Sequence, residues 1–132
     1  MIKRNLEYQD NKASILLDLL HFKNNIDTLR NMLSQIDFDS ETELVSMSRD
    51  DIVEILQRSL DKKISFLGLE EWANLIECRE DIGFDDEKTQ EMIFKLANPY
   101  LYGKLDEGHM LSYLNELDEK CGDKYKIVDV MH

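Results

Sequence analysis

The chain has 132 residues, of which 42% are hydrophobic, and its 28 acidic and 16 basic side chains give a net charge of −12. A chain of this size and apolar content can bury a core of its own, so the composition argues against intrinsic disorder and predicts a single domain over residues 1–132. The negative charge would repel phosphate groups, which argues against direct binding to nucleic acid or to an anionic membrane surface.

Apolar residues recur at helical spacing through a first predicted helix over residues 11–35. The stripe consists of Ile15, Leu19, Phe22, Ile26, Leu29, Leu33 and Ile36. It suits either a long core helix in a bundle or the seam of a coiled-coil homodimer. We favour the core helix, because the rest of the chain is also amphipathic and needs a packing partner. Asn24 and Asn25 could divide this helix into two.

Local capping signals position the remaining helices. The candidate N-caps, in chain order, are Ser48, Ser65, Asp85 or Asp86, and Asp106. The helices that follow them are expected to end at residues 61–63, near Arg79, at Asn98 before Pro99, and before Gly122. Residues 37–46 are acidic and aperiodic, which predicts a loop.

The fold class follows from these elements together. With 5 Gly and 1 Pro, the chain has few of the turn residues that a barrel or sandwich requires. We therefore expect an all-α single domain, an irregular bundle of about five helices. Residues 100–102 form a short aromatic loop closed by Gly103, and the β-branched residues 125–132 suggest an extended arm or one short strand.

The densest acidic stretch runs from residue 70 to residue 87, with eight acids against one base, Arg79. At about 100° per residue, one face of the third predicted helix carries a line of polar side chains. That line consists of Glu70, Asn74, Glu77 and Asp81. Arg79 points away from it, and Trp72, Ala73 and Ile76 lie on the opposite face, where we expect them to pack in the core.

Like charges at this spacing repel one another, so the carboxylate face is either a solvated surface or a docking surface for a basic partner. We favour docking, with Asp85 and Asp86 extending the surface into the next loop. Tyr100 and Tyr102 are candidate apolar anchors, or else a pair of rings packed over the end of the fourth helix. The predicted partner-binding residues are Glu70, Asn74, Glu77, Asp81, Asp85, Asp86, Tyr100 and Tyr102.

Motifs for catalysis or metal binding are lacking. The three histidines are far apart in sequence, and neither a phosphate-binding glycine loop nor a nucleophile motif occurs. We expect no metal, no cofactor and no enzymatic activity. The start of the chain lacks the apolar run of a signal peptide, so we expect a cytoplasmic protein. Cys78 and Cys121 are then reduced and half-buried, with a bridge between them as the alternative.

Two runs in the second half of the chain resemble a pattern of small bacterial immunity proteins. They are WANLIECREDIGF at residues 72–84 and IFKLANPYLYGKL at residues 93–105, followed by a final helix. The similarity covers roughly residues 65–117, less than half of the chain. Cys78 stands where the pattern has a glycine or another small residue.

The resemblance implies a cognate inhibitor in a toxin–immunity pair of the contact-dependent growth inhibition type. Such a protein stays in the cytoplasm and binds the C-terminal effector domain of its toxin one-to-one. We expect that toxin to be a basic nuclease, with a ribonuclease as the first candidate, whose active-site cleft the acidic inhibitor blocks. When free, the inhibitor should be a monomer. The alternatives are an acidic helical adaptor or regulator of another basic protein, or the coiled-coil homodimer.

Overall fold

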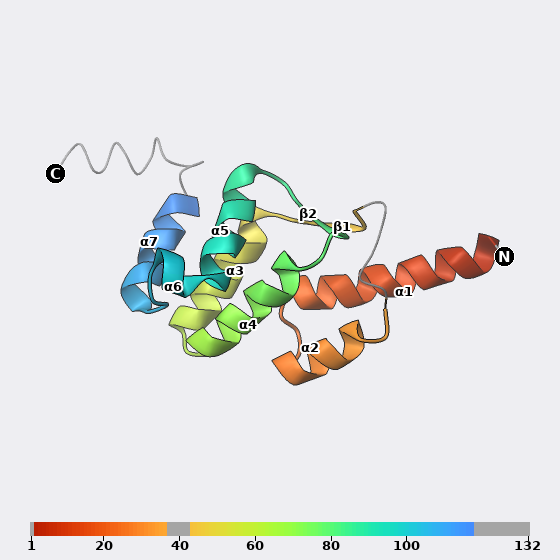
Figure 1. The fold of residues 1–132 in the computed structure, drawn as a ribbon, viewed down its shortest axis with the longest axis horizontal. Helices are drawn as coiled ribbons and strands as arrows, with labels where there is room; N and C mark the ends of the chain where they lie inside the picture. The colour runs from red at the N-terminus through yellow and green to blue at the C-terminus, as the bar shows by residue number, and fades with distance from the viewer. Residues whose placement is uncertain (1, 37–42, 118–132) are drawn as a thin grey trace.

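The computed structural model describes residues 2–36 and 43–117, with side chains from Asn11 onward. These residues form seven helices and one pair of short parallel strands (Figure 1). The helices are α1 (Ile2–Leu20), α2 (Ile26–Leu33), α3 (Arg49–Leu60), α4 (Phe66–Glu77), α5 (Glu87–Ala97), α6 (Pro99–Tyr102) and α7 (Glu107–Leu117). In Figure 1, α1 and α2 lie at one end of the molecule, α6 and α7 lie at the other, and α3, α4 and α5 lie between them. The all-α prediction is confirmed.

The first predicted helix is in fact two helices. α1 ends at Leu20, and Asn25 caps α2 by accepting a hydrogen bond of 2.8 Å from the backbone N–H of Thr28. The predicted apolar stripe continues across this break, and its residues are buried in the core of the chain or packed against it. The stripe therefore serves as a core face and is not free to form a coiled-coil seam.

The predicted helix starts are confirmed, because each depends on neighbouring residues only. Ser48 and Asp51 form a reciprocal capping box at α3, and Ser65 accepts a hydrogen bond at the start of α4. Asp86, rather than Asp85, caps α5, and Asp106 accepts from the backbone N–H of His109 at the start of α7. α4 ends at Glu77, before the predicted end near Arg79.

A parallel strand pair, which the sequence did not predict, links the two halves of the chain. β1 (Val45–Met47) pairs with β2 (Ile82–Phe84), with Val45 opposite Ile82 and Met47 opposite Phe84. The prediction of a loop at residues 43–46 is therefore partly wrong, since pairing between distant segments leaves little local signal. Residues 37–42, the stop at Gly122 and the predicted C-terminal arm lie outside the described residues.

The core forms around α4, which packs against α5, α2 and α1. Trp72 is fully buried, and its indole Nε1 donates a hydrogen bond of 2.6 Å to the backbone oxygen of Leu19. Ala73 and Ile76 are also buried, so the predicted core face of this helix is confirmed.

Cys78 is exposed rather than half-buried, because it follows the last residue of α4 as its C-cap. Cys121 lies outside the described residues. Within the described residues, no helix has both the length and the apolar character that crossing a membrane requires.

Candidate partner-binding surface

Asp81 does not lie on the acidic surface. Its side chain is fully buried, and the guanidinium of Arg79 donates to both carboxylate oxygens at 2.9 Å. The ammonium group of Lys12, on α1, lies 3.3 Å from one of these oxygens. Burial by itself would raise the pKa of Asp81, but the hydrogen bonds and charges of Arg79 and Lys12 outweigh it and hold the pKa below its ordinary value.

The prediction for Asp81 is wrong because it extended the helical phase too far. α4 ends at Glu77, so rotation by 100° per residue no longer applies at Arg79 and Asp81. The chain turns inward at this point, and the backbone oxygen of Asp81 accepts from the N–H of Leu44 at 2.8 Å. Asp81 thus joins α1, the start of β2 and the segment before β1, and it is a structural residue.

Two further acids of the predicted stretch are also engaged in ion pairs. Glu71 pairs with Arg30, and Asp86 pairs with Arg49 at 2.8 Å. The backbone N–H and hydroxyl of Thr89 both donate to Asp86, and these bonds together with Arg49 lower its pKa to about 2. Five of the eight acids remain without an ion pair among the described residues. They are Glu70, Glu77, Glu80, Asp85 and Glu87.

Three of these unpaired carboxylates, Glu77, Glu80 and Glu87, line a hollow of about 520 Å³ beside β2, which we call the β2 hollow. Its lining residues are Glu43, Glu77, Arg79, Glu80, Ile82, Phe84, Asp86, Glu87 and Gln90. Arg79 is the basic residue of this lining, and its charge faces the buried carboxylate of Asp81. The carboxylate of Glu43 lies directly over Gly83, where a Cβ atom would overlap it. Gly83 therefore allows Glu43 to approach the strand closely.

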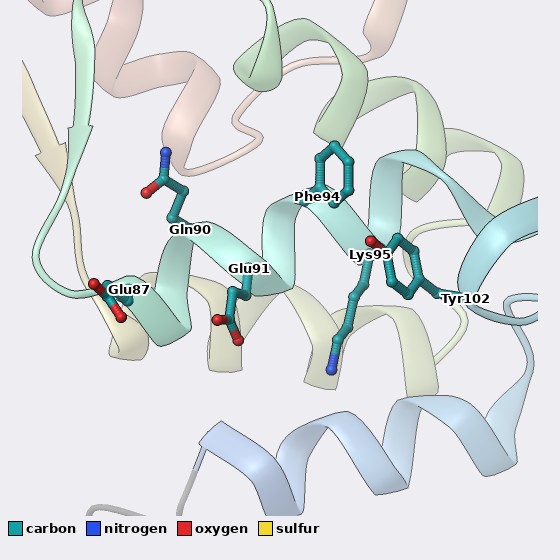
Figure 2. A pocket seen from close by; sticks show the side chains of 6 residues that line it. All are labelled: Glu87, Gln90, Glu91, Phe94, Lys95 and Tyr102. Atoms are coloured by element: carbon teal, nitrogen blue, oxygen red, sulfur yellow. The ribbon is translucent and has the colours of Figure 1, made fainter.

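A second hollow, of about 560 Å³, lies between α5 and α6, and we call it the α5–α6 hollow. Its lining residues are Glu87, Gln90, Glu91, Phe94, Lys95 and Tyr102 (Figure 2). Because Glu87 and Gln90 line both hollows, the two are continuous along α5. The rings of Phe94 and Tyr102 meet edge to face, with centroids 5.6 Å apart, and both side chains are more than 40% exposed.

α6 is the most exposed apolar element among the described residues. It consists of Pro-Tyr-Leu-Tyr and contains no buried residue, with Tyr100 81% and Leu101 62% exposed. Pro99 begins this helix without strain, since the first turn needs no backbone donor there. The predicted aromatic loop is therefore a short helix, and the prediction that its rings could pack over the end of α5 holds only for the contact between Tyr102 and Phe94.

Two hydrogen bonds between side chains connect α6 to Glu77 of α4. The amide nitrogen of Asn98 donates to Glu77 at 3.2 Å, and the hydroxyl of Tyr100 donates to the amide oxygen of Asn98 at 3.3 Å. The two hollows and α6 thus form one continuous surface. We call it the acidic–aromatic face, consisting of Glu43, Glu77, Glu80, Asp86, Glu87, Gln90, Glu91, Phe94, Tyr100, Leu101 and Tyr102.

The structure brings together only part of the predicted set. Four of the predicted residues lie on the acidic–aromatic face: Glu77, Asp86, Tyr100 and Tyr102. Glu70 and Asn74 lie on α4 and line neither hollow, while Asp85 accepts a hydrogen bond from the Ser46 hydroxyl at 2.6 Å.

The predicted set lacked seven of the eleven residues of the face: Glu43, Glu80, Glu87, Gln90, Glu91, Phe94 and Leu101. A signal for Phe94 was present, because it falls out of phase with the buried stripe of α5, and a large aromatic residue on the outer face of a helix needs an explanation. Glu87 and Glu91 are four residues apart and so share one side of α5. Glu43 could not be found this way, because β1–β2 pairing alone brings its segment to this surface.

Within the described residues, no group of three or more His, Cys, Asp or Glu side chains is arranged to hold a metal ion. Comparisons with protein-family models, curated proteins and solved structures found no match. The functional conclusion therefore depends on the chemistry of the acidic–aromatic face and on the sequence resemblance.

Proposed function

We propose that this protein is an immunity protein that binds the effector domain of a cognate bacterial toxin one-to-one through the acidic–aromatic face. The observation that carries the proposal is the position of α6, whose apolar side chains stay exposed while Tyr102 lines the α5–α6 hollow beside the carboxylates of Glu87 and Glu91. Exposed apolar clusters rimmed by polar residues mark interaction sites, because apolar side chains that stay in water do not stabilise the unbound protein. The inhibitor acts by covering the toxin and catalyses no reaction.

The charges of the face favour a basic partner. Three basic residues near it are already engaged: Arg79 with Asp81, Arg49 with Asp86, and Lys95 with Glu116. The carboxylates of Glu77, Glu80, Glu87 and Glu91 are then available for lysine or arginine side chains of the partner. Complementary charge speeds association and sets orientation, while exposed aromatic residues supply much of the affinity. A nuclease cleft that binds phosphates offers the matching positive surface.

The sequence resemblance supports the same surface. The two resembling runs, residues 72–84 and 93–105, include much of α4, all of β2 and α6, and the second half of α5. These are the elements that build most of the acidic–aromatic face. Six of the eleven residues of the face lie in these runs: Glu77, Glu80, Phe94, Tyr100, Leu101 and Tyr102.

The proposal is tested by charge reversal on the face. A double variant, Glu77→Lys with Glu87→Lys, changes the net charge from −12 to −8. We expect it to slow association with the toxin domain roughly ten-fold or more at low salt. The new lysines weaken the electrostatic attraction of the basic partner and place like charges opposite each other in the interface. The partner is first captured from lysate of the native host at low and high salt. Its purified catalytic domain is then titrated with the inhibitor, and an equimolar amount should abolish its activity.

A matched control separates local contacts from overall charge. Glu54→Lys with Asp61→Lys, on exposed positions of α3 and at its end, makes the same change in net charge away from the face. If both double variants slow association equally, only long-range charge matters and the face is not the interface. Capture of a basic protein whose activity is unchanged by binding would instead point to an adaptor.

A further inference from the structure

We infer that the α5–α6 hollow receives one arginine side chain of the partner, with its guanidinium stacked on Tyr102 and paired with Glu91. This inference depends on the proposed function, since it names the residue type that the acidic–aromatic face recognises. The hollow has a volume of about 560 Å³, which leaves room for one long side chain and ordered water.

The negative charge of this hollow is not neutralised within the described part of the chain. Glu87 and Glu91 form no ion pair there, and Lys95 is drawn to Glu116, with its Nζ 3.2 Å from the carboxylate. The same Nζ lies over the ring of Tyr113, 5.7 Å from its centroid. Figure 2 shows the Lys95 side chain running toward α7, so its aliphatic stem lines the hollow while its charge is balanced elsewhere.

The two aromatic rings of the hollow favour arginine over lysine. Phe94 supports the ring of Tyr102 through an edge-to-face contact, and Tyr102 remains 44% exposed. A planar guanidinium can stack on such a ring and donate two parallel hydrogen bonds to one carboxylate. The ammonium group of lysine is a strongly hydrated point charge and cannot do both at once. The ring of Tyr102, supported by Phe94, and the unpaired carboxylate of Glu91 together therefore suit a guanidinium better than an ammonium group.

The experiment uses the full chain and two blocked tripeptides, triarginine and trilysine, at the same ionic strength. Binding is followed by the backbone amide NMR signals of α5 and α6. We expect the largest shifts between Glu87 and Tyr102, and a dissociation constant about two- to five-fold lower for triarginine. Tyr102→Ala should remove this preference, whereas Tyr102→Phe, which keeps the ring, should retain it. Glu91→Gln should weaken both peptides, and Glu54→Gln on α3 serves as the matched control.

Equal affinities for the two peptides, or shifts centred outside the hollow, would overturn the inference. Its failure can be told apart from that of the proposed function. If the peptides bind equally but Glu77→Lys with Glu87→Lys still slows association with the toxin, the immunity role stands and the arginine pocket does not. If triarginine is preferred at Tyr102 but no basic protein is inhibited, the pocket stands and the immunity role does not.

Discussion

Replacing Asp81 with asparagine should strongly destabilise the fold, although Asp81 belongs to the most acidic stretch of the sequence. The substitution keeps the shape of the side chain and removes its charge. Arg79 and Lys12, which are 6% and 3% exposed, would then lie in the interior without the carboxylate that they share. Removing one partner of a buried ion pair typically costs about 3–5 kcal/mol, because the attraction that offset the desolvation of the other charge is lost.

We expect about 3 kcal/mol for Asp81→Asn, at the lower end of this range, since the amide oxygen can still accept one hydrogen bond. For a domain of this size, that corresponds to a decrease of roughly 10 °C or more in Tm. Urea unfolding followed by tryptophan fluorescence is a suitable assay. Trp72 is the only tryptophan and is fully buried between α4 and α1, so its emission reports the packing that Asp81 holds together.

Glu80→Gln provides the matched control, because Glu80 is the exposed neighbour of Asp81 and has no ion pair among the described residues. Its unfolding free energy should stay within about 0.5 kcal/mol of the wild type. If Asp81→Asn matched this control, the buried pair would contribute no stability in solution. The structural role that we assign to Asp81 would then be wrong.

Two other predictions concern α7 and the start of α5. The hydroxyl of Tyr113 is buried and has no hydrogen-bond partner among the described residues. Tyr113→Phe should therefore leave the unfolding free energy unchanged or raise it by up to about 1 kcal/mol. A loss of more than about 1 kcal/mol, measured by urea unfolding, would mean that this hydroxyl is hydrogen-bonded. The pKa of Asp86 is about 2 in the folded protein and 3.8 ordinarily, so its contribution to stability is present above pH 3.8 and is lost as the pH falls from 3.8 toward 2. The difference in unfolding free energy between the wild type and Asp86→Asn should shrink over this window, and a difference that stays constant from pH 6 to pH 2 would contradict this assignment.

The local features of this protein could be predicted from the sequence by itself. The caps at Ser48, Ser65 and Asp86 act through hydrogen bonds that span only three residues. Similarly, the core face of α4 follows from apolar residues one turn apart, with Trp72 at its centre. These interactions depend on neighbours along the chain, so spacing and residue type are enough to predict them.

Only the tertiary structure decided which acidic side chains are available to a partner. Asp81 and Glu77 look alike in sequence, but Lys12 and Arg79 enclose Asp81, whereas Glu77 stays at the surface. The pairing of β1 with β2 brings Glu43 beside the acidic stretch, and no local pattern marks that contact. Burial and ion pairing depend on segments that are far apart in the chain, and for this reason charge density in the sequence overestimates the charge that the folded surface presents.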